Sequence, residues 1–331
     1  MAKRALALLL GITGDMGFAA ACLLLALRRH SPALRPDILV FSDGRLPSGD
    51  ALLLRELGAS ILPFSPPAGD FSPDAVRQFS LLSLARFEGF RLLDQYRTVM
   101  WLDVDTAIQD DISPLAEYGP LSLALEDPHF TDAGVTSPAS INVDAPLPDF
   151  DGNAPNLNSG VLVLRDDLPR PHDLHRLCLE WLKTWGPRCR YIDQAVLNML
   201  AQKLQRESSG LFRLVPYERF NAHPRNPAAG HAALVHAFGA YKLWDDGLTR
   251  CSFPEWDRDY QRWLKLGGSP WQGSVDNAEY LNGGAFSMLR RLFESTTRAQ
   301  ALIEGQQAEL ARERGLRARL EQLVRHLEPP A

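Results

Sequence analysis

Short apolar runs alternate with helical segments in the N-terminal part of the chain, and this alternation constrains the fold more than any other feature. The apolar runs predict strands that end at Gly11 and cover residues 37–42, 61–64 and 98–108. Residues with helical spacing lie between them, at 19–29, 51–58 and 71–90. Such alternation is typical of a sheet with helices on both faces. We therefore expect an α/β fold around a central sheet.

The composition fits a globular enzyme with one large core. The 331 residues are 45% hydrophobic, and the formal net charge is −5. Because there is no long run of lysine and arginine, we expect no nucleic-acid partner. The cysteines are scattered without metal or redox spacing, which favours reduced buried thiols. They are Cys22, Cys178, Cys189 and Cys251.

The N-terminus shares only part of the pattern of a signal peptide. Lys3 and Arg4 precede an apolar run, but GITGD interrupts that run, and the next one leads into Arg28 and Arg29. No run approaches the roughly 20 apolar residues that span a bilayer. We expect a cytoplasmic protein without a transmembrane segment, either free or peripheral to a membrane.

The stretch LLLGITGDMGF, residues 8–18, carries glycines with the spacing of a dinucleotide-binding turn. Asp43 ends the next apolar run about where a ribose-binding acid would lie. A short-chain dehydrogenase also needs a tyrosine with a lysine four residues later, and no tyrosine of this chain has one. We interpret the turn as part of a nucleotide-sugar site and keep an NAD(P)-dependent dehydrogenase as the lesser alternative.

Two carboxylates, Asp103 and Asp105, end the apolar stretch TVMWLDVDT. On an ideal strand they project from one face, with Val104 on the other. Such a pair can hold a divalent cation that also takes diphosphate oxygens. On its own, the pair is more typical of a solvated strand end.

Other motifs change that interpretation. In HAFGAYKLW, His236 offers a nitrogen ligand to Mn²⁺, Gly239 lets the backbone approach a phosphate, and Lys242 supplies a point charge. Asn158 with Ser159, and Asp193 with Gln194, put short polar groups at element ends, where sugar hydroxyls bind. Taken singly, each pair is better explained by an ordinary structural role, a turn for the first and a helix N-cap for the second.

Together the motifs resemble those of the retaining glycosyltransferases of family eight, of the glycogenin and lipopolysaccharide galactosyltransferase type. WLDVDT is similar to the family motif YLDADT, LNSG at 157–160 to FNSG or FNAG, and DQA at 193–195 to DQD. HAFGAYKLW at 236–244 is similar to HFxGxxKPW and, more loosely, VPYERFN at 215–221 to LPxxYN. The motifs keep the family order from about residue 6 to residue 250.

The resemblance implies a GT-A-type, Rossmann-like nucleotide-sugar domain with a mixed central sheet, and retaining transfer of a hexose from a UDP-sugar. It implies that Asp103, Asp105 and His236 bind Mn²⁺ or Mg²⁺, and that the catalytic group consists of Asp193, Gln194 and Lys242. The implied donor contacts are Thr13, Asp15, Phe18, Arg86, Asp103, Val104, Asp105, Asn158, Ser159, Gly239 and Lys242, with Glu126 or Asp127 as a further contact.

The chain departs from the family motifs at three positions. Leu243 replaces a proline, Phe220 stands where tyrosine is common, and Ala195 replaces the second acid of DQD. These changes put the donor sugar in doubt more than the activity. Because no carboxylate is placed as a nucleophile and Gln194 would be a poor one, we expect the acceptor hydroxyl to attack on the leaving-group face. The cation and Lys242 would stabilise the charge on UDP.

The C-terminal part of the chain is rich in Ala, Leu, Glu, Gln and Arg. We expect a catalytic domain at residues 1–250, an aromatic-rich connecting segment at 251–284 and a long C-terminal helix at 285–331. The helix either forms a homo-oligomer or binds a partner, or it packs back on its own domain, and Gly305 and Gly315 interrupt a continuous coiled coil.

The acceptor is the open question at the level of sequence. A glycan, a lipid-linked saccharide and a protein are all compatible with the motifs. The aromatic residues of the connecting segment either stack on sugar rings or belong to the core; they are Trp256, Tyr260, Trp263 and Trp271. The alternative of another class is a non-catalytic nucleotide-sugar-binding or glycan-binding protein with the same fold.

Overall fold

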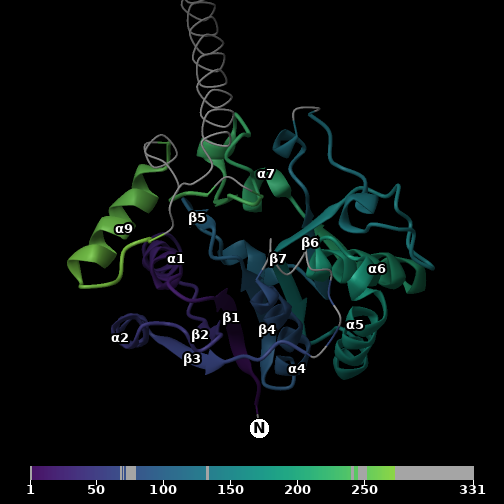
Figure 1. Ribbon diagram of the computed structural model, residues 1–331, viewed down its shortest axis with the longest axis horizontal. Helices are drawn as coiled ribbons and strands as arrows, with labels where there is room; N and C mark the ends of the chain where they lie inside the picture. Colours follow the sequence, from purple (N-terminus) through teal and green to yellow (C-terminus); the bar gives the residue numbers. More distant parts are fainter. Residues whose placement is uncertain are drawn as a thin grey trace, which may run out of the picture. The chain divides into compact units, whose positions relative to one another are not determined.

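The computed structural model describes residues 2–67, 69, 71, 80–131, 134–239, 242–244 and 252–272. These residues form a central sheet with helices on both faces (Figure 1). The helix expected at residues 285–331 and Cys251 lie outside the described residues. Among those described, no helix combines the length and the apolar character needed to cross a bilayer.

The central sheet has seven strands in the order β3–β2–β1–β4–β7–β6–β8. Their bounds are β1 Arg4–Ile12, β2 Asp37–Ser42, β3 Ala59–Pro63, β4 Tyr96–Leu102, β6 Leu121–Leu125, β7 Leu157–Arg165 and β8 Phe212–Val215. Strands β1 to β4 run parallel, whereas β7 runs antiparallel to both β4 and β6. The mixed α/β sheet predicted from the sequence is thus confirmed.

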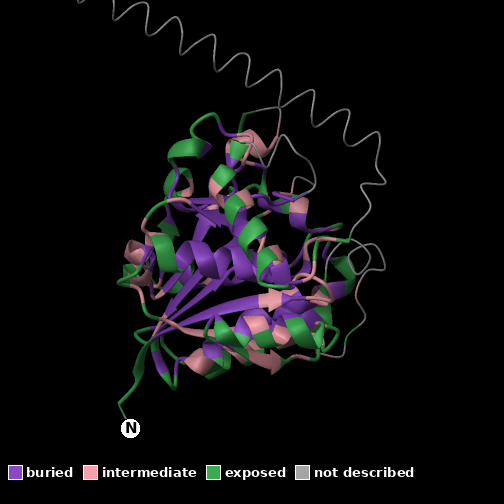
Figure 2. Cartoon of the chain, turned by 90° about the vertical axis from the view of Figure 1, so that its left-hand side faces the viewer, coloured by how far each residue is buried: buried purple, intermediate pink, exposed green. Residues whose placement is uncertain are grey.

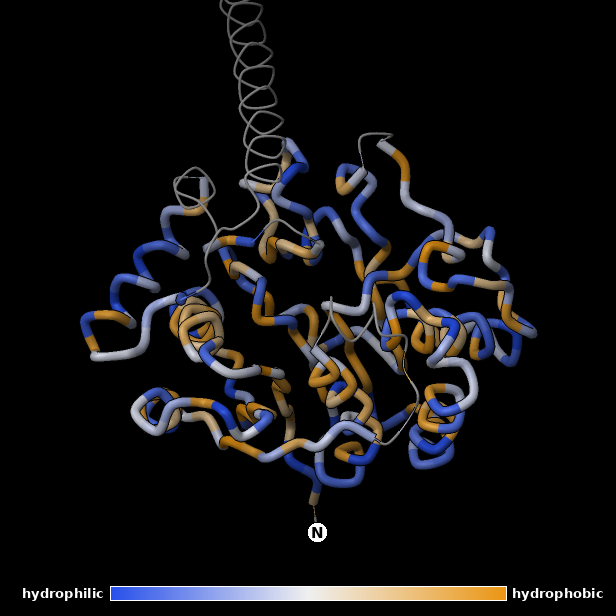
Figure 3. Tube along the Cα trace, viewed as in Figure 1, coloured by the Kyte–Doolittle hydropathy of each residue, from blue (hydrophilic) through white to orange (hydrophobic). Residues whose placement is uncertain are grey.

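Hydrophobic side chains cover both faces of this sheet. In β1, Leu8 and Leu10 belong to one core while Ala7 and Leu9 belong to the other, because successive strand residues point to opposite faces. Figure 2 shows the strands buried between the helices, and Figure 3 shows hydrophobic residues along the strands and α1. The helices of the first core are α1 Gly17–His30, α2 Ser48–Glu56 and α9 Pro254–Lys265; those of the second are α4 Glu88–Leu92, α5 Pro171–Trp185 and α6 Ile192–Glu207.

Helix α9 packs its aromatic side chains against α1. Trp256, Tyr260 and Trp263 are buried, and the rings of Phe18 and Tyr260 lie 5.5 Å apart with their planes nearly perpendicular. Arg29 adds two hydrogen bonds of 2.7 Å to the Asp259 carboxylate. Of the two interpretations of these aromatic residues, the packed core is therefore the one that fits.

The three cysteines within the described part of the chain are buried and form no disulfide with one another, in agreement with the buried reduced thiols expected from the sequence: Cys22, Cys178 and Cys189.

A second sheet of two short strands positions the acidic motif. It pairs β5, Thr106–Ile108, antiparallel with β9, Leu234–His236. Thr106 lies opposite His236, and Ala237 N donates to Asp105 O over 2.9 Å. Two segments 130 residues apart in sequence are thereby fixed side by side.

Two local predictions differ from the structure. The strand expected at 98–108 is two strands, since β4 ends at Leu102 and β5 begins in another sheet, so Asp103–Asp105 form the turn between them. Arg86, expected on an α-helix, lies on the 3₁₀ helix η1, Leu81–Phe87, which Ser80 caps by accepting from Leu82 N. Residues 72–79 of that expected helix lie outside the described part.

The remaining short helices are η2 Ser113–Glu117, η3 Pro128–Phe130, η4 Ala139–Asn142, η5 Gly186–Arg188, α7 Tyr217–Phe220 and η6 Ala229–His231.

Candidate active site

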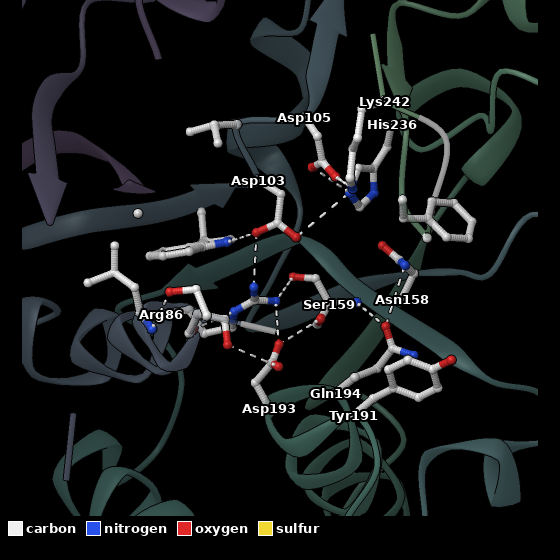
Figure 4. A pocket seen from close by; sticks show the side chains of 18 of the residues that line it. Arg86, Asp103, Asp105, Asn158, Ser159, Tyr191, Asp193, Gln194, His236 and Lys242 are labelled. Atoms are coloured by element: carbon white, nitrogen blue, oxygen red, sulfur yellow. Dashed lines mark hydrogen bonds and ion pairs between the residues drawn. The ribbon is translucent and has the colours of Figure 1, made fainter. Parts of the chain in front are cut away.

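A cavity of about 450 Å³ opens where β1 and β4 end and where β7 and α6 begin. Because β7 is antiparallel to β4, its first residues lie at the same edge of the sheet as the last residues of β4. Ligands of open α/β sheets bind at this edge. Figure 4 shows Asp103, Asp105, His236 and Lys242 on one side of the cavity and Arg86, Asp193 and Gln194 on the other.

Asp103, Asp105 and His236 form the candidate metal centre. One ligand atom from each lies within 4.8 Å of the others. His236 Nε2 is 3.1 Å from Asp105 Oδ1 and 3.7 Å from Asp103 Oδ2. This buried nitrogen has no hydrogen-bond partner among the described residues. Two carboxylates and one nitrogen aimed at the same point fit a hard or borderline divalent cation such as Mn²⁺ or Mg²⁺.

Two residues hold the His236 ring in this orientation. His236 Nδ1 lies 2.9 Å from Oδ1 of the fully buried Asn221, which only accepts, so Nδ1 carries the proton and Nε2 keeps its lone pair for a metal. Gly160 has no side chain, and a Cβ at that position would coincide with the imidazole. The glycine of the LNSG motif thus makes room for the ligand histidine.

We expect Asn221→Leu to weaken Mn²⁺ binding about 10- to 100-fold, the usual effect of removing a group that orients a metal ligand. Without the acceptor at Nδ1, the proton can move to Nε2, and the ring can rotate. Calorimetric titration of Mn²⁺ in the presence of UDP measures the change. Unchanged Mn²⁺ affinity in a folded variant would contradict the assigned role of Asn221.

Lys242 completes this side of the cavity by pairing with the metal-site carboxylate Asp105. Its Nζ donates to Asp105 Oδ2 and, over 3.0 Å, to Ala237 O. Burial by itself raises the pKa of Asp105, but the positive charge of Lys242 outweighs it, with a further contribution from the neighbouring His236, and the pKa of Asp105 is held well below its ordinary value. Asp105 is therefore ionised and ready to act as a ligand.

Arg86 connects the metal side of the cavity to the α6 side. It is only 2% exposed, and its guanidinium donates to Asp103 Oδ1 over 2.9 Å and pairs with Asp193 Oδ2 over 2.9 Å. Further hydrogen bonds reach the carbonyl oxygens of Ser83 and Ser159. The sequence predicted a donor contact for Arg86; its position lines the cavity, and its hydrogen bonds orient two acids.

The DQ and NSG motifs meet at the base of the cavity. Asp193 accepts from the hydroxyls of Ser83 over 3.2 Å and Ser159 over 2.9 Å. Gln194 Oε1 accepts from Ser159 N over 3.2 Å and from Asn158 Nδ2 over 3.4 Å. The helix N-cap interpretation of Asp193 is wrong, because α6 begins at Ile192 and its N-cap residue, Tyr191, makes no side-chain capping bond.

The predicted donor loop is only partly at the cavity. Thr13, Val104 and Gly239 are among the lining residues, whereas Asp15 and Phe18 are not among the described lining residues. Phe18 is fully buried against the aromatic side chains of α9, so a direct contact between its ring and uridine does not fit the structure. Gly239 has a φ of +73°, which favours glycine, and a Cβ there would lie 2.6 Å from the Phe130 ring.

The structure does not support Asp43 as the ribose-binding acid of a dehydrogenase. Asp43 Oδ1 accepts from Gly14 N over 3.3 Å and from Arg45 N over 3.0 Å. The side chain that would bind a ribose instead holds the glycine turn in place.

Of the two acids proposed as a further donor contact, Glu126 lines the cavity. Asp127 is fully buried and accepts from His223 N and Asn226 Nδ2, each over 2.8 Å. His223 Nδ1 accepts from Arg225 N, so Nε2 carries the proton and donates to Phe238 O. Asp127 and His223 thus support the loop structure beside the cavity.

Burial lowers the pKa of His223 to about 3, from an ordinary value of 6.5. Between these pH values the unfolded chain binds a proton that the folded chain does not, so stability falls as the pH drops below 6.5. From about pH 7.5 to about pH 5, we expect His223 to account for a loss of about 2 kcal/mol in the free energy of unfolding. Urea unfolding of the wild type and His223→Gln across this range measures it. Parallel pH profiles for the two proteins would contradict the prediction.

Sequence reasoning missed several residues that organise the site. Asn221 lies in the VPYERFN stretch, but nothing in that motif indicates a bond to His236. Ser83 precedes Arg86 by one 3₁₀ turn and supports Asp193. Asn142 and Asn156 lie in the long connection between β6 and β7, where asparagine is an ordinary turn residue.

Comparison with known proteins identifies the family. Residues 61–247 match the family described as glycosyl transferase family 8, so the chain belongs to this family and is a glycosyltransferase. No curated protein sequence matches the chain. Solved structures that share the fold include the apo form of WbbM, a bifunctional glycosyltransferase, and the galactosyltransferase LgtC with donor and acceptor sugar analogs.

The similarity to these structures lies in the fold. WbbM is 14% identical with a TM-score of 0.58, covering 81% of this chain and 52% of WbbM, so the chain spans about half of that protein. LgtC is 17% identical with a TM-score of 0.54, covering 83% of this chain and 99% of LgtC. A structure of an LgtC active-site variant with glutamine changed to glutamate gives 17% identity and a TM-score of 0.55, covering 81% of this chain and 98% of that one.

Proposed function

We propose that this glycosyltransferase moves a hexose from a UDP-sugar to an acceptor hydroxyl, with retention of anomeric configuration and with Mn²⁺ or Mg²⁺ bound. The observation that carries the proposal is the convergence of Asp103, Asp105 and the unpartnered His236 Nε2 at the cavity. A cation held there would neutralise charge on the diphosphate leaving group.

The chain's own side chains perform the other tasks. Lys242, 27% exposed at the cavity, exchanges its pairing with Asp105 for a diphosphate oxygen and stabilises charge that develops there. Arg86 keeps Asp103 and Asp193 oriented. Thr13, Val104 and Gly239 line the nucleotide end of the cavity, with Asp15 nearby in sequence.

Asn158, Ser159, Asp193 and Gln194 form the hexose end. Both Asp193 oxygens already accept hydrogen bonds, and Gln194 Oε1 accepts two, so neither group is a free nucleophile. Attack by the acceptor hydroxyl on the leaving-group face agrees with this arrangement, with the departing phosphate taking the hydroxyl proton. One LgtC structure carries a change at an active-site glutamine, and we propose a comparable place for Gln194 in this chain.

The wider organisation follows the sequence predictions. We propose that residues 1–250 form the catalytic domain, that residues 251–284 connect it to the C-terminal part while their helix α9 packs against α1, and that residues 285–331 serve oligomerisation or partner binding. The acceptor is a glycan, a lipid-linked saccharide or a protein, and the enzyme acts in the cytoplasm, free or at a membrane surface.

A donor screen tests this proposal. Purified protein with Mn²⁺ is incubated with UDP-glucose, UDP-galactose and related donors, and released UDP is measured, with GDP-sugars as controls. We expect release from one or a few UDP-hexoses that stops with EDTA, and an axial product linkage from an axial donor by NMR. Turnover of GDP-sugars alone, or an inverted linkage, would contradict the proposal.

A further inference from the structure

A series of hydrogen-bonded side chains runs from Gln194, which lines the cavity, to the buried Glu126. Gln194 Nε2 donates to Asn142 Oδ1 over 2.9 Å, Asn142 Nδ2 donates to Asn156 Oδ1 over 2.7 Å, and Asn156 Nδ2 donates to Glu126 Oε2 over 2.9 Å. Asn142 and Asn156 are fully buried and Glu126 is 3% exposed. We name these four residues the amide chain.

Backbone N–H groups donate into the amide chain at both ends. Ser137 N donates to Glu126 Oε1 over 3.2 Å, and Ser159 N donates to Gln194 Oε1 over 3.2 Å. An amide side chain accepts through its oxygen and donates through its nitrogen. A series made only of amides, receiving a donor at each end, would bring two donors face to face at one of its links. One member that only accepts removes this conflict, and Glu126 is that member.

The carboxylate of Glu126 therefore sets the direction of each amide. Asn156 turns its NH₂ group toward Glu126, Asn142 turns its own toward Asn156, and Gln194 turns its own toward Asn142. As a result, the Gln194 oxygen faces Ser159 and the cavity. Reversal of Gln194 would set its NH₂ group against the N–H of Ser159, which is costly in a buried setting.

We propose that Glu126, Asn142 and Asn156 are positioning residues that act through Gln194 and fix its oxygen toward the hexose. The proposal rests on the donor-sugar site proposed above. It gives Glu126 a role different from the direct donor contact expected from sequence. It also gives a physical reason for two buried asparagines in the connection between β6 and β7.

Moving the acceptor-only group along the chain tests this role. Glu126→Gln makes the series all amide and leaves two donors opposed. Asn156→Asp alone sets two carboxylates side by side. The double variant E126Q/N156D restores a consistent pattern. Ser137 N then donates to the new amide oxygen at position 126, the new NH₂ group there donates to one oxygen of the carboxylate introduced at position 156, and Asn142 donates to the other oxygen. All three variants keep nearly the original volumes.

The measurements are kcat and KM for donor turnover, the affinity for UDP alone and the melting temperature. We expect each single variant to lose about 10- to 100-fold in kcat, the usual effect of a misplaced active-site group, with UDP affinity within about twofold of the wild type. The double variant should recover kcat to within about threefold and recover the melting temperature as well. Asn153→Asp, an exposed Asn-to-Asp change three residues earlier, is the matched control.

Three outcomes would overturn the proposal. If the double variant regains its melting temperature but not kcat, the Glu126 charge acts on the sugar directly. If the single variants lose stability but keep kcat, the amide chain is only structural. If E126Q changes neither kcat nor the melting temperature, the amide chain does not set the orientation of Gln194. A wild type without turnover would instead contradict the proposed function, while the melting temperatures would still decide whether Glu126 sets the hydrogen-bond pattern.

Discussion

Asp105→Asn is expected to lower sugar transfer about 10³-fold or more while leaving the protein folded, because it removes a metal ligand without changing side-chain volume. Asp105 lies 3.1 Å from His236 Nε2 and also pairs with Lys242. Without its charge, the candidate metal centre keeps one carboxylate and one imidazole, and Lys242 loses its counter-ion. The loss should appear mainly in kcat, since the bound cation stabilises charge on the departing diphosphate.

Asp110→Asn is the matched control for this prediction. Asp110 is exposed and lies just after β5, five residues from Asp105. Turnover of the two variants is compared at saturating Mn²⁺, together with their melting temperatures. Activity of D105N within tenfold of the control would contradict the assignment of Asp105 to the metal centre.

Arg86→Met is expected to destabilise the protein by about 3–5 kcal/mol, because it leaves two acids in a buried setting without their cation. Arg86 joins Asp103, Asp193 and the carbonyl of Ser159, and its guanidinium lies 4.9 Å from the Trp101 ring centroid. The methionine keeps most of the length of the side chain but none of its donors. The loss corresponds to a fall of about 10 °C in melting temperature.

Arg91→Met provides the comparison for Arg86. Its side chain is 59% exposed and pairs with Glu88 on the same helix, so its removal should change stability by no more than about 0.5 kcal/mol. Thermal unfolding is followed without nucleotide or metal, so that ligand binding does not contribute. Equal melting temperatures for the two variants would show that Arg86 does not hold the two acids in place.

Much of this fold follows from local sequence pattern. The apolar run before Gly11 became β1, which is buried over most of its length, as expected of a central parallel strand. The stretches at 37–42 and 61–64 became β2 and β3, which are only partly buried toward the edge of the sheet. The expected strand at 98–108 was wrong because the apolar pattern continues through a turn in which the chain changes sheets. An apolar pattern indicates that residues are buried, but it does not indicate in which sheet they lie. Thr106–Ile108 are buried in β5, so their pattern looks like a continuation of β4.

The metal centre was predicted from motifs, with Asp103 and Asp105 expected on one face of a single strand. In the structure the two residues lie in the turn between β4 and β5. Asp103 and Asp105 converge on His236 because β5 pairs with β9, a contact between segments far apart in sequence. The family resemblance placed Phe18 among the donor contacts. Its ring lies in the core because α9 brings Trp256 and Tyr260 over it.

The supporting residues could not be predicted because their roles depend on tertiary contacts. Asn221 is identified only by its hydrogen bond to His236, and Gly160 only by the ring that takes the place of its Cβ. Asn142 and Asn156 acquire their roles from a series that starts on α6 and ends after β6. A single sequence contains no signal for such a series.

The most direct test of the central claim, a metal-dependent UDP-sugar site built on Asp103, Asp105 and His236, is calorimetric titration of UDP. UDP is titrated into the wild type with Mn²⁺, into the wild type with EDTA, and into D105N with Mn²⁺. The account predicts binding in the first experiment and a large loss of affinity in the other two. Equal UDP affinity in all three, or no UDP binding in any of them, would contradict it.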